Sequence, residues 1–125
     1  MRYLLDTHLL LWAAADTLPR SAKKYFAEEH ELYFSPASIW EVVIKRALGR
    51  NDFQIDPKTF HEGLRVAGYI ELPITGQHAI AVESLPSIHK DPFDRILLAQ
   101  AESERMYLIT TDGDLAKYPS RIIRV

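Results

Sequence analysis

The sequence has no cysteine and few glycines, and no hydrophobic run in it is long enough to cross a membrane. Without cysteine the chain can form neither disulfides nor thiolate metal sites, so any metal must be bound by oxygen atoms or by histidine. The apolar stretch at residues 9–15 is far shorter than the roughly 20 residues of a transmembrane helix. Asp6 and His8 directly precede it, which is unlike a signal peptide. We therefore expect a cytoplasmic protein with no membrane partner.

The composition is that of a soluble globular protein with one domain over residues 1–125. Apolar residues make up 47% of the 125-residue chain and charged residues 26%, which suits one hydrophobic core. The formal net charge of −2 argues against strong, nonspecific binding to nucleic acid. It is still compatible with a basic rim around an acidic centre.

Local signals predict short strands that alternate with helices. The expected strands cover residues 2–5, 31–34, 69–74, 107–110 and 122–123. The expected helices cover 7–15, 20–30, 36–48, 57–67, 76–84 and 92–104, with a polar connection at 50–56 and a turn with a short helix at 112–118. Because such strands pair in parallel through right-handed crossovers, we expect an α/β fold. Its mainly parallel central sheet would have about four to five strands, with helices on both faces.

Four acidic residues fall where this fold would bring them together. Asp6 and Asp112 each follow an apolar strand, and sites in parallel sheets form at the carboxyl ends of strands. Glu41 and Asp94 lie on helices between them. Carboxylates that converge repel each other unless a cation lies between them, and hard ions such as Mg²⁺ prefer carboxylate oxygens. Metal-dependent phosphodiester chemistry is therefore the leading hypothesis.

Asp6 and Glu41 also have ordinary structural interpretations. Asp6 could cap the helix that begins at Thr7, but an unpaired carboxylate directly after a buried strand is costly, which favours a functional role. Glu41 could form a surface i, i+4 pair with Lys45. The apolar residues that surround Glu41 in the sequence indicate that its helix is largely buried, so a functional role stays open.

The remaining acids occur in pairs. Asp91 and Asp94 both suit the start of a helix, as cap and first-turn residue, and we favour Asp94 as the metal ligand and Asp91 as a cap or supporting residue. Asp112 and Asp114 bracket Gly113 and could form a turn. Their spacing is similar to the start of an EF-hand loop, but no helix precedes it and the downstream glutamate is missing, which excludes that site.

Histidine and aromatic residues near the acids are harder to interpret. His8 and His89 could assist the acids or bind a metal, although a single histidine near a helix start is more often a surface or capping residue. We expect Trp12, Trp40 and Phe93 to lie in the core.

Basic and hydroxyl side chains flank the acids in the sequence. The basic residues are Lys45, Arg46, Lys90 and Arg95. They could offset the acidity and contact the phosphate backbone of a substrate, or they could be solvated helix residues. The hydroxyl of Thr110 or Thr111 could orient a carboxylate, or both could be ordinary strand residues.

Sequence pieces around these residues resemble the PIN-domain ribonucleases, and within them the VapC-type toxins of toxin–antitoxin pairs. The pieces are Leu4-Leu5-Asp6-Thr7-His8 with Leu11-Trp12, Ser35-Pro36-Ala37-Ser38-Ile39-Trp40-Glu41 with Lys45, His89-Lys90-Asp91-Pro92-Phe93-Asp94-Arg95, and Leu108-Ile109-Thr110-Thr111-Asp112. Their order and spacing cover essentially the whole chain, and they look like the subgroup with a tryptophan before the helical glutamate.

The resemblance implies a catalytic and metal-binding quartet, with Mg²⁺ or Mn²⁺ as cofactor and RNA as substrate. Asp6 and Asp94 would be the principal ligands, and Asp112 and Glu41 would hold a second ion or orient the attacking water. Thr110 would be a supporting hydroxyl. The resemblance further implies a homodimer that a small antitoxin neutralises by inserting a segment into the active-site groove. It leaves the roles of Asp91 and Asp114 open.

Other functions fit the sequence less well. Haloacid-dehalogenase phosphatases need a second aspartate two residues after the strand-end one, and that position is His8. Receiver domains need a phosphoacceptor aspartate on a central strand and a late strand-end lysine, and the sequence has neither at the expected strand ends. A catalytically inactive PIN-like module that binds RNA or protein remains the alternative, and metal binding would separate it from an enzyme.

Overall fold

Five parallel strands form the central sheet of this computed structural model, in the spatial order β3-β2-β1-β4-β5. The strands are β1 (Arg2–Leu5), β2 (Glu31–Phe34), β3 (Ile70–Glu71), β4 (Tyr107–Thr110) and β5 (Ile122–Arg124). The structure describes residues 1–51 and 53–125, so part of the expected connection at 50–56 lies outside the described residues. The predicted α/β architecture with a parallel sheet is confirmed.

Helices connect successive strands, and their starts follow the capping signals in the sequence. The helices are α1 (Thr7–Ala14), α2 (Pro36–Ala47), α3 (Pro57–Val66), α4 (Gly76–Ala81) and α5 (Pro92–Glu104), with 3-10 helices η1 (Arg20–Phe26), η2 (Val82–Ser84) and η3 (Leu115–Lys117). The side chains of Ser35, Asp56 and Asp91 cap α2, α3 and α5, and each cap is followed by proline. No helix in the described part of the chain is long and apolar enough to span a membrane.

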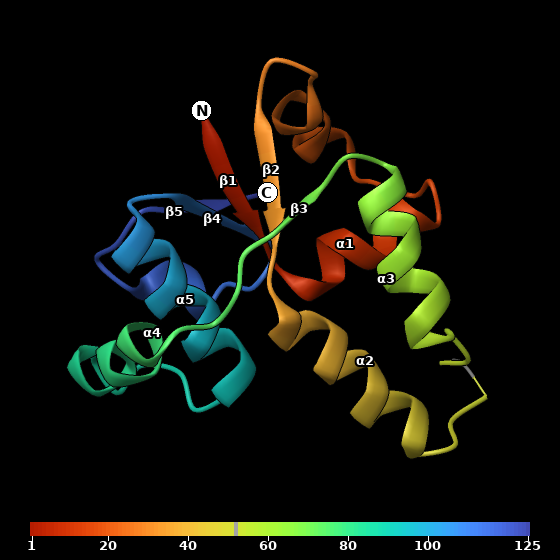
Figure 1. Ribbon diagram of the computed structural model, residues 1–125. Helices are drawn as coiled ribbons and strands as arrows, with labels where there is room; N and C mark the ends of the chain where they lie inside the picture. The colour runs from red at the N-terminus through yellow and green to blue at the C-terminus, as the bar shows by residue number, and fades with distance from the viewer. Residues whose placement is uncertain (52) are drawn as a thin grey trace.

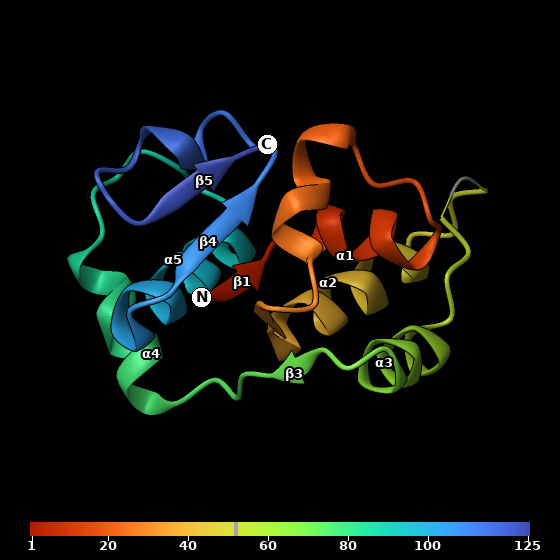
Figure 2. The same cartoon turned by 90° about the horizontal axis from the view of Figure 1, so that it is seen from above.

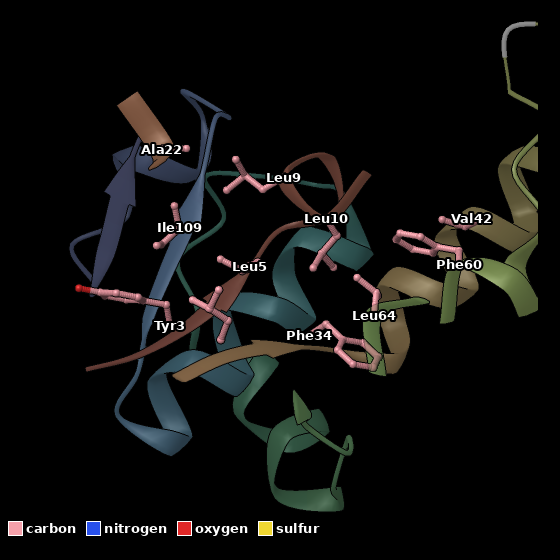
Figure 3. Packing of buried hydrophobic residues seen from close by; sticks show 11 residues of the cluster. Tyr3, Leu5, Leu9, Leu10, Ala22, Phe34, Val42, Phe60, Leu64 and Ile109 are labelled. Atoms are coloured by element: carbon pink, nitrogen blue, oxygen red, sulfur yellow. The ribbon is translucent and has the colours of Figure 1, made fainter. Parts of the chain in front are cut away.

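The two faces of the sheet bury separate hydrophobic clusters, as the alternation of side chains along β1 requires. Leu5 points to the face covered by α1, α3 and η1, where Leu9, Phe60 and Ile109 also pack (Figure 3). Leu4 points to the opposite face, which α5 covers (Figure 2). Leu4 and Leu5 are both fully buried, and each such side chain contributes about 2 kcal/mol of hydrophobic stabilisation. The buried strands therefore hold the ends of β1 and β4 in a fixed position.

β1 and β4 lie side by side at the centre of the sheet although they come from opposite parts of the sequence. Leu5 pairs in register with Ile109, and the backbone N–H of Asp6 donates to the Ile109 carbonyl at 3.1 Å. Asp6, which follows β1, and Thr110, the last residue of β4, therefore lie at the same edge of the sheet. Helix α2 starts from the end of β2 and runs away from this edge (Figure 1).

Two predicted elements are shorter than the sequence pattern indicated. The expected helix at 20–30 forms only the 3-10 helix η1, which buries Ala22 alone before the chain turns extended at Ala27. The expected strand at 69–74 has ladder pairing only at Ile70–Glu71, where both side chains are exposed. The Leu72 N–H still donates to the Phe34 carbonyl at 2.8 Å, and Pro73 has no N–H to continue the ladder.

Candidate active site

Asp6 is a buried carboxylate that the end of β1 and the start of α1 hold between them. Its side chain is 3% exposed, and Oδ1 accepts the Leu9 N–H at 3.0 Å as the cap of α1. Oδ2 accepts the Thr110 hydroxyl at 2.5 Å and the Thr111 N–H at 3.3 Å. Burial raises the pKa of Asp6, while the bonds from Thr110 and the backbone act in the opposite direction. The predicted capping role is therefore real, and it leaves lone pairs on the carboxylate for a further partner.

Thr110 links two of the predicted acids. Its hydroxyl donates to Asp6 and accepts the backbone N–H of Asp112 at 3.0 Å, so the hydroxyl fixes both the Asp6 carboxylate and the turn that carries Asp112. Thr110 is fully buried at the end of β4. The supporting role in catalysis that the resemblance implied for Thr110 stays a prediction.

Glu41 is buried on α2 with a partner at each oxygen. Oε1 accepts the Thr7 hydroxyl at 2.7 Å, and Oε2 lies 3.0 Å from the Lys45 ammonium group. Ser38, one turn earlier on α2, lies within 2.9 Å of the Thr7 hydroxyl. The sequence indicated the pair with Lys45, but nothing in it signalled the contact with Thr7, which comes from the neighbouring helix α1.

Asp94, Asp112 and His89 form the tightest cluster of the site. His89 Nε2 lies 3.0 Å from Asp94 Oδ2 and 3.0 Å from Asp112 Oδ2. One ligand atom from each of these residues lies within 4.8 Å of the others, a spacing that could hold a metal ion. Asp94 is in the first turn of α5, and Asp112 follows β4. Sequence reasoning considered His89 but favoured a surface or capping role, whereas the structure places it between two of the acids.

The charges in this cluster shift the pKa values of its members. Burial, followed by the nearby carboxylate of Asp91, raises the pKa of Asp94 to about 7, and Glu41 and Asp112 add to the effect. Burial acts to raise the pKa of Asp112, but its hydrogen bonds from His89 and from backbone N–H groups together lower it. Asp94 therefore holds a proton up to near neutral pH. A cation that binds to these carboxylates would displace that proton.

The pKa of His89 shifts in the direction that its acidic neighbours favour. Burial acts to lower it, but the hydrogen bond with Asp112 and the charges of Asp94, Asp112 and Asp91 together raise it. His89 Nδ1 accepts the backbone N–H of Asp91 at 3.2 Å, so the ring proton of neutral His89 lies on Nε2, facing the two carboxylates. A histidine that binds a metal usually donates its other ring N–H to an acceptor, so this arrangement favours a hydrogen-bond donor over a metal ligand.

The two extra acids of the sequence have structural tasks. Asp91 caps α5 by accepting the N–H groups of Phe93 at 2.8 Å and Asp94 at 3.3 Å. Asp114 donates its backbone N–H to Asp112 Oδ1 at 2.8 Å, while its exposed carboxylate pairs with Lys117 at 3.1 Å. The Asp91 carboxylate therefore fixes the start of α5, where Asp94 lies, and the backbone N–H of Asp114 fixes the Asp112 carboxylate.

The predicted RNA-binding residues occupy different environments. Arg46 is on the surface and pairs with Asp56 at 2.9 Å, and Lys90 is exposed. Lys45 is occupied by Glu41. The Arg95 guanidinium donates to the carbonyls of Val82, Pro86 and His89 and to the Tyr118 hydroxyl, at 3.1–3.2 Å. Arg95 therefore ties down the loop that carries His89.

Trp40 corrects an expectation from the sequence. We expected it in the core, but it is 62% exposed, whereas Glu41 beside it is 8% exposed. Val43 and Ile44 are also exposed, so α2 is not the largely buried helix that its apolar residues suggested. The Trp40 ring lies against Phe93, with the ring centroids 5.3 Å apart. α2 buries Ala37 and Val42 on one side and leaves Trp40 exposed on another.

The arrangement can bind a divalent cation. The oxygens of Asp94 and Asp112 converge, and the carboxylates of Asp6 and Glu41 are buried beside the same strand ends. Carboxylate oxygen is the donor type that Mg²⁺ and Mn²⁺ prefer, and buried anions that repel each other gain most from a cation. The donor set therefore fits such an ion. An apolar groove of about 600 Å³ between α1 and α3, lined by Leu11 and Phe60 among others, contains none of these acids.

Comparison with known proteins places this fold. The sequence matches the PIN domain family over residues 3–120, and a search of curated proteins found no match. The solved VapBC2 of Rickettsia felis, bound to a DNA fragment from its promoter, has a TM-score of 0.75 at 13% identity, covering 100% of this chain and 99% of that chain. The DNA-bound VapBC of Salmonella typhimurium has a TM-score of 0.70 at 15% identity, covering 99% and 98%. A toxin–antitoxin complex from Klebsiella pneumoniae has a TM-score of 0.63 at 21% identity, covering 97% and 95%.

At these identities the likeness to solved structures shows the shared fold alone. The family match is broader, because it runs from β1 to the turn before β5 and includes all four acids of the predicted quartet. This chain belongs to the PIN domain family.

Proposed function

We propose that the protein is a metal-dependent endoribonuclease that acts as the toxin of a toxin–antitoxin pair. The observation that carries this proposal is the convergence of Asp94 and Asp112 at the carboxyl ends of the central strands, with Asp6 and Glu41 buried beside them. PIN nucleases act on nucleic acids, which gives the reaction class. The RNA substrate and the use of Mg²⁺ or Mn²⁺ are our proposal.

The protein side chains would divide the work of hydrolysis. Hydrolysis forms a bond between a water oxygen and phosphorus and breaks the bond from phosphorus to a sugar oxygen. A divalent ion supplies a lowered water pKa and neutralises phosphate charge when bound. Asp6 and Asp94 would be its principal ligands, and Asp112 and Glu41 would hold a second ion or orient the water. Thr110 fixes the Asp6 carboxylate for this task through its 2.5 Å hydrogen bond.

The proposed partners rest on similarity. The structures from R. felis and S. typhimurium contain VapBC, a toxin–antitoxin pair, with DNA. By analogy, a small antitoxin would neutralise this protein, which would itself be a homodimer. Lys45, Arg46, Lys90 and Arg95 remain the proposed contacts to the RNA backbone, and exposed Lys90 is the best placed of them.

The decisive experiment is cleavage of total cellular RNA by the purified protein with Mn²⁺. Discrete fragments that vanish with a chelator and with Asp6→Asn would support the proposal, because Asn keeps the helix cap but loses the charge. Asp114→Asn is the matched control, since this acid is exposed and pairs with Lys117, and it should cleave like the wild type. Cleavage that survives in Asp6→Asn would refute the role of the quartet.

The alternative is an inactive module of the same fold that binds RNA or protein. An inactive module has no need to keep a converging set of buried carboxylates, so it should bind Mn²⁺ weakly. Titration calorimetry with Mn²⁺ separates the two cases without any substrate. Tight binding that Asp94→Asn abolishes would favour the enzyme.

A further inference from the structure

An aromatic pair lies directly beside the acids, and the chemistry proposed above does not use it. Trp40 precedes Glu41 on α2, and Phe93 precedes Asp94 on α5. Their rings meet edge to face, with centroids 5.3 Å apart and an interplanar angle of 79°. Two helices thus bring together two aromatic residues, each of which adjoins one of the acids in the chain.

The indole ring is fixed in place and yet open to solvent. Phe93 holds it from one side in a geometry that aromatic pairs favour. Trp40 nevertheless remains 62% exposed, and no described residue accepts a hydrogen bond from its indole N–H. A preorganised aromatic face with a free donor is suited to bind a flat ligand at little cost in side-chain entropy.

The acidic charges of the site weaken the binding of a nucleic acid, and an aromatic surface can add affinity. The formal net charge of the chain is −2, and the acidic centre repels the phosphates of a nucleic acid. Of the cations nearest to the acids, Lys45 is paired with Glu41, and Arg95 donates to loop carbonyls. Lys90 is the exposed cation that remains beside the acids, so a contact that does not depend on charge would add to the affinity for RNA. Base stacking on an aromatic ring is such a contact and does not depend on charge.

We propose that Trp40, supported by Phe93, forms a stacking subsite for an unpaired nucleobase of the RNA, next to the bond that the acids hydrolyse. This inference rests on the proposed ribonuclease function. Stacking on an aromatic side chain tolerates every base, because each base has a π-face. The subsite would therefore favour single-stranded RNA over duplex RNA and would set the position of the chain relative to Asp94.

A protein partner is the competing occupant, and Leu48 separates the two. Leu48 is also an exposed apolar residue of this helical segment, at 68%, but it follows Trp40 by about two turns, or roughly 12 Å. A base beside Glu41 would touch Trp40 and would not reach Leu48. A protein laid along α2 would contact both residues. Trp40 adjoins Glu41 in the chain and its ring meets Phe93, which adjoins Asp94, and this place next to two of the acids favours the base.

The test compares Trp40→Ala, Trp40→Phe and Leu48→Ala in cleavage of an RNA 12-mer copied from the site that the total-RNA experiment maps. Trp40→Ala should lower kcat/KM by about 5- to 150-fold, mainly through KM, as expected for the loss of one stacked base. Trp40→Phe should retain most of the activity, and Leu48→Ala should match the wild type. Since Trp40 is exposed, all three variants should keep the wild-type circular dichroism spectrum and melting temperature.

A second set of probes identifies the stacked base. In these 12-mers one nucleotide at a time is abasic. At one position, loss of the base should weaken cleavage by the wild type. The same abasic 12-mer should be cleaved by Trp40→Ala no more weakly than the complete 12-mer, because the lost base and the lost ring belong to one contact. Additive losses at every position would overturn the inference.

Three other results would also overturn it, and they are distinguishable. If Trp40→Ala cleaves like the wild type, the indole ring does not bind the RNA. If Trp40→Ala and Leu48→Ala change only the sedimentation of the protein, α2 is a protein contact. In both cases the ribonuclease proposal stands. If the wild type cleaves no RNA with Mn²⁺, the ribonuclease proposal itself fails and the stacking subsite falls with it.

Discussion

The hydrogen bond that His89 Nδ1 accepts from the Asp91 backbone defines what this side chain can do. It leaves the ring proton on Nε2, between Asp94 and Asp112 at 3.0 Å from each. In the metal-free protein His89 therefore relieves part of the repulsion between these carboxylates. His89 has this effect although it does not belong to the four carboxylates that the sequence predicted as metal ligands.

His89→Ala should destabilise the metal-free protein by about 1.5–3 kcal/mol, the usual value of a hydrogen bond to a charged group. Because the acids raise the pKa of folded His89, its stabilisation is fully present below the unfolded value near 6.5 and is lost as pH rises through the folded pKa. Thermal melting in chelator should show a lower melting temperature for His89→Ala than for the wild type at pH 6, and a smaller difference at pH 9. A loss that grows with pH would contradict this sign.

Asp94→Asn should stabilise the metal-free protein at neutral and higher pH. The pKa of Asp94 is about 7 in the folded state against 3.8 for a free aspartate side chain, so its ionisation favours unfolding as pH rises from about 4 to 7. Asparagine removes this penalty. The melting temperature in chelator should rise at pH 8 and change little at pH 4, with Asp114→Asn as an unaffected control. A variant that melts well below the wild type at pH 8 would count against repulsion at this site.

The same proton makes metal binding depend on pH. A cation bound by Asp94 must displace the proton that this carboxyl holds below about pH 7. Mn²⁺ affinity should therefore rise tenfold per pH unit up to about pH 7 and level off above it, with release of a proton on binding at pH 6. Calorimetry in buffers of different ionisation enthalpy measures that proton. Affinity independent of pH would exclude Asp94 as a ligand.

At the scale of single elements, the loop between η2 and α5 depends on one side chain. Arg95 donates to three carbonyls of residues 82–89 and to the Tyr118 hydroxyl, whose oxygen also accepts the His89 N–H at 2.9 Å. Arg95→Lys should lower stability by about 2 kcal/mol, because an ammonium group cannot reach these acceptors together. Lys90→Ala should leave the melting temperature unchanged and weaken RNA binding most at low salt. Equal melting of both variants would refute the loop-anchoring role of Arg95.

The elements also show what sequence can and cannot predict. Helix starts at Ser35, Asp56 and Asp91 were predictable, because a cap followed by proline acts locally. The burial of Trp40 was predicted wrongly, because hydrophobicity alone does not say which side of a helix another element covers. Contacts such as Thr7 with Glu41 join residues far apart in sequence, and no local pattern signals them. Asp6 and Asp112 could be proposed because the ends of apolar strands can be recognised in the sequence, whereas the hydrogen-bond partners of the acids could not be predicted.

For the whole molecule, metal binding and folding should be linked. A ligand that binds only the folded state at about 100 times its Kd adds about 2.7 kcal/mol of stability. For a domain of this size that corresponds to a rise in melting temperature of about 10 °C. Mn²⁺ should produce such a shift in the wild type and almost none in Asp6→Asn/Asp94→Asn. Scanning calorimetry in Mn²⁺ and in chelator measures it, and an equal shift in both proteins would place the ion elsewhere.

The pairing of β1 with β4 has a consequence for the synthesis of the protein on the ribosome. Asp6 leaves the ribosome among the first residues, while Thr110 and Asp112 leave it about a hundred residues later. At a typical rate of about 5–20 residues per second, that interval lasts several seconds or more. During this time the nascent chain lacks half of its strand-end acids and the hydroxyl that orients Asp6. The four acids therefore cannot assemble into one site until the last residues of the chain have been synthesised.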